Sequence, residues 1–341
     1  MKLAESHRTE PAPDNTAYPP LLTSLSVLVE RMRMLTGMAV AYGNRDRFFH
    51  AHVGNVQEVE LAGGIFVPRV RPVRDSTLYD LASLTKIFTM IGVMQLVSSG
   101  EISLDDRIGG IDPRFPGLAQ VRLEQAMSYE APLQTPERID TQPDYEAALH
   151  QVFAMVVNPT ESPRPYSDMN ALALKYVVER VSGMPFFDYI ERHILRPAGM
   201  TETYSLVPPD RLGDCACYNY EHRILRHEYR MRSDIPLGVP HDPKAQILRR
   251  DGLDLCGHAG LFSTLPDMAR LCQALLSGKL LPMDTVLRLS TDRRRNANPN
   301  GGFRQYLGML CFIKGPQQRY SEVPSWMSGH AFAQSGYTGN H

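Results

Sequence analysis

The order of apolar and polar residues predicts strands near both ends of the chain and helices between them. In residues 21–37, apolar side chains recur at helical spacing up to a glycine, which predicts an amphipathic helix. Residues 37–55 hold two apolar runs around a Gly-Asn-Arg-Asp turn, which predicts a two-stranded hairpin. Residues 1–20 are polar and contain several prolines, so we expect a flexible tail there.

Helical patterns dominate from about residue 80 to residue 290. Residues 168–183 carry one apolar stripe and end on a glycine, which predicts a helix. Residues 185–199 predict a second helix that ends before Pro197. Residues 263–278 open with a capping-box-like start and close on a glycine, as a third helix would.

Strand-like composition returns at residues 304–315 and 330–339. The pattern therefore predicts an α+β protein, in which an antiparallel sheet flanked by helices is built from both chain ends. A mostly helical domain is inserted into this layer. The expected organisation is a tail at 1–20 and a single catalytic unit at 21–341, with the α/β layer at 21–75 and 300–341 and the helical domain at 76–299.

Composition narrows the partners and the compartment. Apolar residues make up 43% of the 341 residues, and 36 basic residues face 37 acidic ones, so neither nucleic acid nor a membrane surface is an expected partner. The N-terminus lacks the apolar segment of a signal peptide, and no apolar run approaches the roughly 20 residues of a membrane span. Five cysteines, an odd number, suit reduced thiols, so we expect a cytoplasmic protein.

Ser83 and Lys86 stand at the start of the most apolar helical segment, residues 87–97. A helix that is apolar on every side is buried inside a domain. Residues three apart share one face, so the serine and the lysine should meet in its first turn. The helix dipole and burial both favour the neutral form of Lys86, which would help to activate a serine nucleophile. Alternatively, Ser83 only caps the helix and Lys86 extends to solvent.

Longer segments resemble a known family. Residues 77–108, with the Ser-Leu-Thr-Lys motif, resemble the nucleophile region of the serine β-lactamase-like family. Residues 165–204, 257–278 and 331–340 are similar to further segments of it, so the resemblance covers roughly residues 25 to 340. The family includes class C β-lactamases, penicillin-binding D-Ala-D-Ala carboxypeptidases, and related esterases and transacylases. The resemblance implies a β-lactamase/transpeptidase-like fold and an acyl-enzyme reaction.

The resemblance assigns roles to individual residues. Ser83 would be the nucleophile, Lys86 its proton partner, and Tyr166 the group that takes the Ser83 proton and returns it to the leaving group. The backbone N–H groups of Ser83 and Tyr337 would form the oxyanion hole. Asp168 falls where class C enzymes usually have Asn and esterase-like members often have Asp. It is therefore a candidate substrate-binding residue, or else simply the N-cap of the following helix.

The third motif departs from the family pattern. The family has Lys-Thr-Gly or His-Thr-Gly there, whereas this chain has Gln334, Ser335 and Gly336, all of which we expect near the substrate. The family's cation faces a substrate carboxylate, so a neutral amide argues for a neutral ester or amide substrate. Alternatively, Arg164 or His258 supplies the cation; a histidine between small residues is otherwise usually structural.

Two other departures concern the surroundings of the pocket. Residues 127–136 replace a His-Thr-Ser-Gly-Leu loop of the family, so we expect an altered pocket rim. The sequence stops at His341, whereas the family normally continues with strands and a helix. Either the protein is shortened here, or the sheet edge is completed in another way, so a homo-oligomer is one expectation.

Three functions remain open at this point. The first is a serine esterase or transacylase that acts on an ester or amide of a small molecule. The second is a D-Ala-D-Ala carboxypeptidase or class C-type β-lactamase, and the third is a catalytically silent binding homologue. None of these reactions implies a cofactor or a metal.

Overall fold

A computed structural model describes most of the chain. The described residues are 19–158, 165–217, 221–225, 228–232, 236–250, 254–291, 306–315 and 322–338. Most of the expected N-terminal tail lies outside these ranges. Arg164, the alternative cation near the substrate, lies wholly outside them.

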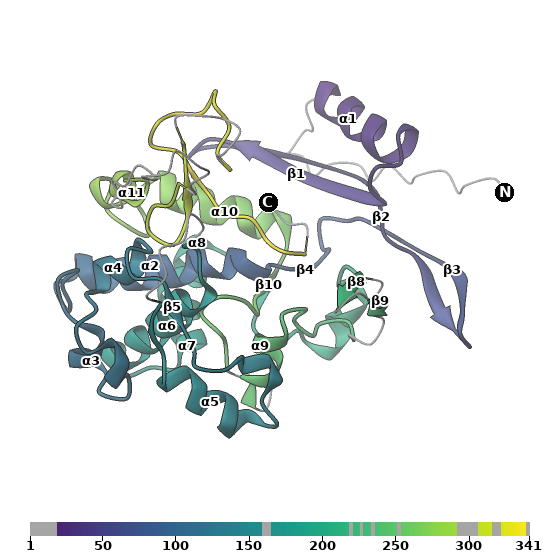
Figure 1. Cartoon of the computed structure of the whole chain (residues 1–341). Coiled ribbons are helices and arrows are strands. Elements are labelled where there is room, and N and C mark those ends of the chain that lie inside the picture. The colour runs from purple at the N-terminus through teal and green to yellow at the C-terminus, as the bar shows by residue number, and fades with distance from the viewer. Residues whose placement is uncertain are drawn as a thin grey trace.

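The N-terminal part is a helix followed by a three-stranded antiparallel sheet (Figure 1). Helix α1 spans Pro19–Ser26 and continues as a π-helical turn, η1, over Val27–Arg31, so the predicted helix is confirmed but ends earlier. Strands β1 (Gly37–Gly43) and β2 (Phe48–Ala62) pair with Gly37 opposite Gly54, which confirms the predicted hairpin.

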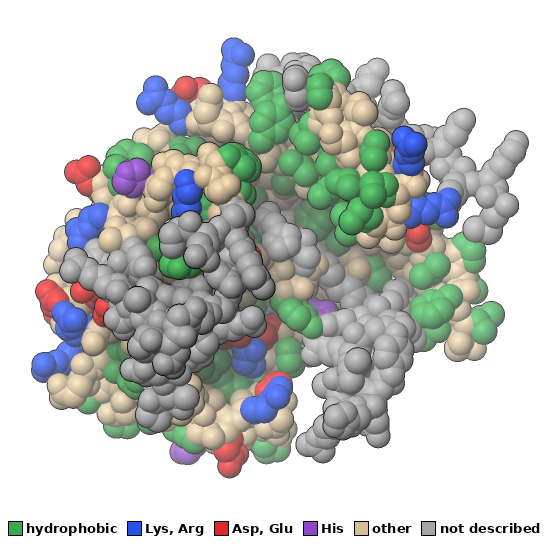
Figure 2. Space-filling view, turned by 45° about the horizontal axis from the view of Figure 1, so that its top comes forward, with side chains coloured by type: hydrophobic (Ala, Val, Ile, Leu, Met, Phe, Trp, Pro, Cys, Tyr) green, Lys and Arg blue, Asp and Glu red, His purple; other side chains and the backbone are tan. Residues whose placement is uncertain are grey.

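Strand β2 is longer than the sequence predicted and pairs with a third strand, β3 (Ile65–Pro72). The turn between them is Gly63-Gly64, and both glycines adopt the left-handed conformation that favours this residue. The β2–β3 hairpin projects from the body, and Ile65, Phe66 and Val70 are at least half exposed on it. Figure 2 shows apolar side chains at this edge of the molecule.

The body is helical, and α2 (Thr85–Ser98) runs through its middle against α6 (Asp168–Ser182). Residues on every side of α2 are buried, as its all-round apolar sequence predicted. Helix α6 begins and ends as predicted, with Gly183 left-handed at its C-cap. The other helical elements are α3 (Ile108–Ile111), η3 (Pro116–Leu118), α4 (Leu123–Met127), η4 (Ile139–Thr141), α5 (Tyr145–Phe153), η6 (Pro209–Asp214), α9 (Pro243–Ile247), α10 (Leu265–Leu276) and α11 (Met283–Leu289).

The helix after α6 does not stop before Pro197, so that prediction was wrong. It runs as α7 (Phe186–Ile190), a π-helical stretch η5 (Glu191–Leu195) and α8 (Arg196–Ala198). Pro197 lies in the first turn of α8, where a missing N–H is tolerated because the π-helical stretch has already shifted the hydrogen-bond register. The element ends at Gly199, which is left-handed.

Short strands complete the α+β fold and confirm its class. Strands β4 (Tyr79–Asp80), β10 (Phe262–Ser263) and β7 (Thr203–Tyr204) form one small sheet in that order. Near the C-terminus, β11 (Phe312–Ile313) pairs with β12 (Phe332–Ala333) within the two stretches expected to form strands. The remaining pairs are β5 (Leu133–Gln134) with β6 (Val156–Val157), and β8 (Glu221–Leu225) with β9 (Glu228–Arg232). No helix within the described ranges is long and apolar enough to cross a membrane.

Candidate active site

Ser83 lies in a short 3-10 turn, η2 (Ala82–Leu84), between β4 and α2. Ala82 has a φ of 44°, a left-handed conformation that is uncommon for alanine. The Asp80 carboxylate stabilises this turn, because one oxygen accepts from the Ala82 N–H at 2.9 Å and the other from the His241 N–H at 2.7 Å. Burial raises the pKa of Asp80 to about 6. The buried carboxyl group of Asp80 therefore holds the turn that presents Ser83 in place.

Lys86 contacts Ser83 directly, as their spacing predicted. Its Nζ is fully buried, donates to Ser83 Oγ at 2.7 Å and lies 2.8 Å from Asp168 Oδ1. Burial lowers the pKa of Lys86, but the Asp168 carboxylate and the Tyr166 side chain outweigh burial, so the net shift is upward. The expectation of a neutral lysine did not take this contact into account: the carboxylate that α6 brings to Lys86 favours the ammonium form.

Tyr166 is held in a stack of aromatic rings. Its ring lies 5.4 Å from that of Tyr129 and 5.3 Å from that of Phe312, the latter nearly parallel with 9° between the planes. Lys86 Nζ lies 4.8 Å from the centre of the Tyr166 ring. The stack and the ammonium leave the phenol little freedom to move, and they place it beside the Ser83–Lys86 pair.

Gln334 contacts the same phenol from the C-terminal hairpin. Its Nε2 donates to Tyr166 Oη at 3.0 Å and to the Ser335 carbonyl at 3.2 Å. A carbonyl only accepts hydrogen bonds, so the Ser335 contact fixes which end of the amide is nitrogen. The Gln334 side chain is buried, and its Oε1 has no hydrogen-bond partner among the residues described.

Asp168 is not the N-cap of α6. Ser167 is, because its Oγ accepts from the Met169 N–H at 3.2 Å and donates to the Leu133 carbonyl at 2.7 Å. Asp168 instead uses both carboxylate oxygens on cations, Oδ1 on Lys86 and Oδ2 on Lys244 at 3.2 Å. These cations hold the pKa of Asp168 well below its usual range despite burial.

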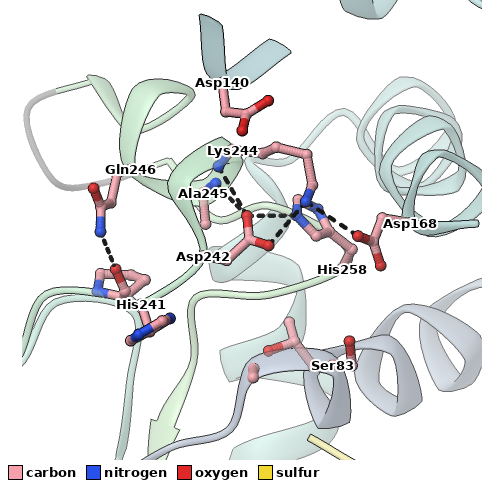
Figure 3. A network of polar contacts seen from close by, with 12 residues as sticks. Ser83, Asp140, Asp168, His241, Asp242, Lys244, Ala245, Gln246 and His258 are labelled. Carbon is pink, nitrogen blue, oxygen red and sulfur yellow. Dashed lines mark hydrogen bonds and ion pairs between the residues drawn. The ribbon is translucent and has the colours of Figure 1, made fainter. Parts of the chain in front are cut away.

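Lys244 and Asp242 extend this ion-pair network, and sequence reasoning missed Lys244. Asp242 caps α9 by accepting from the N–H groups of Lys244 and Ala245, both at 2.9 Å. Its Oδ2 lies 3.0 Å from Lys244 Nζ, and its Oδ1 lies 3.1 Å from His258 Nε2. Figure 3 shows Lys244 between the carboxylates of Asp242 and Asp168. The signal in the sequence was an Asp-Pro-Lys helix start, which alone says nothing about α6.

His258 contacts the network rather than the third-motif residues. Its ring is almost fully buried, and Nε2 faces the Asp242 carboxylate. Its backbone carbonyl lies 3.5 Å from Lys86 Nζ. Together these contacts describe a structural histidine, in line with the usual role of a histidine between small residues.

Asp168, Asp242 and His258 also bring three potential metal-ligand atoms within 4.8 Å of one another. Two ammonium groups already contact the carboxylates, Lys86 on one and Lys244 on both. The cluster is therefore arranged as alternating charges, and a divalent cation would meet two positive groups there.

A cavity of about 500 Å³ lies beside Tyr166, Asp168 and Lys244. The segment 132–140 also lines it, and this segment includes part of the stretch in which we expected an altered rim. Such a volume suits a small molecule.

The third-motif loop lies against the nucleophile turn. Thr338 Oγ1 donates to the Asp80 carbonyl at 2.9 Å, and the ring of Tyr337 lies 5.6 Å from that of His241. Ser335 and Gly336 follow Gln334 in this loop. The oxyanion hole assigned to the Ser83 and Tyr337 backbones stays a prediction.

The comparisons with known proteins agree with this fold. A family model described as Beta-lactamase matches residues 26–341, so the chain belongs to the beta-lactamase family. This is a family of serine hydrolases, as the predicted enzyme class required.

A relative in Escherichia coli (strain K12), named "Putative D-alanyl-D-alanine carboxypeptidase", is 26% identical over 306 residues. The match covers 81% of this chain and 68% of the relative. A Salmonella schwarzengrund relative of the same name is 28% identical over 265 residues, which are 68% of this chain and 60% of the relative.

Solved structures share the fold. A penicillin-binding protein homologue from Caulobacter crescentus superimposes with a TM-score of 0.67 at 19% identity, over 95% of this chain and 88% of that one. A class C beta-lactamase in complex with cefoxitin gives a TM-score of 0.57 at 19% identity, over 80% of this chain and 69% of that one.

Proposed function

We propose that this protein is a serine esterase or transacylase that acts on a neutral ester or amide of a small molecule. The observation that carries the proposal is the buried amide of Gln334, which donates to Tyr166 Oη where the family pattern has lysine or histidine. An amide cannot neutralise a substrate carboxylate as a cation does. An acyl donor that is uncharged at this point therefore fits the site best.

In the proposed reaction, Ser83 Oγ bonds to the substrate carbonyl carbon and its proton passes to the oxygen of Tyr166. Lys86 donates to Ser83 Oγ as an ammonium, so it cannot accept that proton in the same state. The site must first release one proton to solvent, since a phenol that keeps its own proton cannot take another. The N–H groups of Ser83 and Tyr337 would hold the carbonyl oxygen as it becomes negative.

Tyr166 then returns the proton to the departing alcohol or amine, which leaves an acyl group on Ser83. Water, or an acceptor alcohol or amine, releases this acyl group by the same proton path in reverse. We also propose a cytoplasmic location, which the five free cysteines support because cytoplasmic proteins usually keep their thiols reduced.

A second candidate is a D-Ala-D-Ala carboxypeptidase or β-lactamase. The names of the Escherichia coli and Salmonella relatives favour it. Such substrates carry a carboxylate, which would need a cation in place of Gln334. Arg138 lines the cavity but already pairs with Asp140.

The test is covalent labelling of the purified protein with a fluorophosphonate, a penicillin and a p-nitrophenyl ester, read by mass spectrometry at Ser83. We expect a phosphonate adduct and turnover of the ester, but no penicillin adduct. Ser83→Ala should abolish both activities, whereas Ser99→Ala, on the exposed end of α2, should leave them unchanged.

A stable penicillin adduct at Ser83 would favour the second candidate. No adduct with any reagent would refute both enzymatic proposals and leave a binding homologue. Ester turnover that survives in Ser83→Ala would show that another residue is the nucleophile.

A further inference from the structure

Lys244 lies in a closed ring of polar contacts that begins and ends at Lys86. Asp168 links the two ammonium groups, with Oδ1 2.8 Å from Lys86 Nζ and Oδ2 3.2 Å from Lys244 Nζ. Lys244 contacts Asp242, and Asp242 contacts the His258 ring. The His258 carbonyl returns to Lys86 Nζ at 3.5 Å. Figure 3 shows the part of this ring around Lys244.

The position of Lys244 is costly on local grounds alone. Its side chain is only 20% exposed, and burial disfavours its charged form. Two carboxylates outweigh this penalty and raise the pKa of Lys244 above its usual range. The lysine is thus held by the network and not by its helix.

The charge of Lys244 affects how readily the site releases a proton. Lys86 contacts one carboxylate, Asp168, which strengthens its hold on its proton. Lys244 places a second positive charge on that same carboxylate. A positive charge there weakens the field that Asp168 exerts on Lys86, so the site should release a proton at lower pH than it would without Lys244.

We propose that Lys244 is a positioning residue that holds Asp168 and offsets its charge, so that the site around Lys86 gives up a proton at a lower pH than it would without Lys244. This inference rests on the proposed function, because the released proton is the one that must leave before Ser83 attacks. Lys244 acts through Asp168 and need not touch the reacting atoms.

Other charged or titratable groups face this part of the site, and all of them except Asp242, which one variant below changes, stay the same during the test. They come from the loop after α4, from β4, from η4, from the start of α9 and from the loop before β10: Tyr129, Asp80, Asp140, Asp242 and His258. The experiment therefore compares variants that change one charge at a time within the same surroundings.

The test measures how the rate of Ser83 labelling by a fluorophosphonate depends on pH, since this reagent has no titrating group near neutrality. In Lys244→Met, we expect the rising limb of the profile to move to higher pH by about 1 unit. Lys244→Arg keeps the charge and should keep the limb in place. Lys279→Met, an exposed lysine after α10, removes the same charge elsewhere and should change nothing.

Asp242→Asn gives an independent test with the opposite sign. Asparagine still caps a helix, so α9 should persist, but one negative charge is lost and the limb should move to lower pH. A slower Lys244→Met whose limb has not moved would overturn the proposal and leave Lys244 a packing role. If Lys244→Met does not fold, an unmoved limb in Asp242→Asn would overturn it. Absence of Ser83 labelling in the wild type would instead refute the proposed function.

Discussion

The two sides of Ser83 are built from opposite kinds of residue. On one side, Lys86, Asp168 and Lys244 alternate in charge with contacts of 2.8 and 3.2 Å. On the other side, Tyr166 lies in an aromatic stack and accepts from the neutral amide of Gln334. In the proposed reaction the charged side governs the release of a proton from the site, whereas the neutral side carries the phenol and offers a substrate an amide in place of a cation.

The two sides also differ in how completely their polar atoms are paired. Each ammonium on the charged side contacts a carboxylate. On the neutral side, Tyr129 Oη and Gln334 Oε1 are buried without a hydrogen-bond partner in the part of the chain that the structure describes. Unpaired buried polar atoms are costly, so the neutral side is where a substrate would gain most by supplying a donor.

Removal of the phenol hydroxyl should have the largest effect. Tyr166→Phe keeps the aromatic stack but removes the oxygen that takes the Ser83 proton. We expect the rate of Ser83 acylation by a p-nitrophenyl ester to fall by about 10²- to 10⁴-fold. Tyr42→Phe, which changes an exposed tyrosine of strand β1, is the matched control. An unchanged rate in Tyr166→Phe would show that the phenol oxygen takes no part in the acylation of Ser83.

On the charged side, Asp168→Asn should reduce the free energy of unfolding by about 3 kcal/mol, because the buried Lys86 loses its carboxylate. The pKa of Lys86 should fall, so the rising limb of the labelling profile should move to lower pH. Denaturant unfolding at pH 7 and the labelling profile measure the two effects.

The same variant tests the sign of the pH dependence. The pKa of Asp168 is lowered in the folded protein, so its stabilisation is present above about pH 4 and is lost as the pH falls further. Asp168→Asn should lack this part of the acid-induced loss. If wild type and variant lose stability in parallel below pH 4, the ion pair contributes nothing.

A lysine at position 334 should change the preference between a carboxylate-bearing ester and its neutral analogue by about tenfold. In Gln334→Lys, kcat/KM for an ester that bears a free carboxylate should rise relative to that for its neutral analogue. Gln334→Asn, which stays neutral, should leave the ratio near its wild-type value. If Gln334→Lys gives an unchanged ratio, the substrate carboxylate does not reach this position.

The smallest effect concerns the buried hydroxyl of Tyr129, whose pKa burial raises well above its ordinary value. Tyr129→Phe removes an unpaired polar group and keeps the ring against Tyr166. We expect the free energy of unfolding to stay the same or rise by about 1 kcal/mol. A clear loss of stability would show that this hydroxyl is paired in solution.

Local sequence patterns predicted the elements whose causes are local. The stripe in residues 168–183 and its terminal glycine gave α6 and its left-handed cap. Thr264 is the N-cap of α10, because its Oγ1 accepts from the Asp267 N–H, and this agrees with the capping-box-like start predicted for residues 263–278. Strand β3 was not predicted, since its pairing with β2 depends on a Gly-Gly turn that follows an unusually long strand. Pro197 was misjudged because a π-helical stretch precedes it.

The features of the site also divide into those that the sequence was enough to predict and those that depend on residues distant in the chain. The spacing of Ser83 and Lys86 was enough to predict their contact, and the family resemblance brought Tyr166, Asp168 and Gln334 to the same place. The prediction of a neutral Lys86 failed because the charge of this lysine depends on a carboxylate from another helix, which is distant in sequence. Lys244 was missed for the same reason, since only the fold brings α9 beside α6.

Helix α2 is buried on every side, and the nucleophile turn leads directly into it. Amide hydrogens in such a helix exchange with solvent only when the whole body opens. Heating or denaturant should therefore not detach Ser83 and Lys86 early, as it would if they lay on a mobile surface loop. Loss of Ser83 labelling and amide exchange in α2 should follow the same transition, whereas the projecting β2–β3 hairpin should exchange long before.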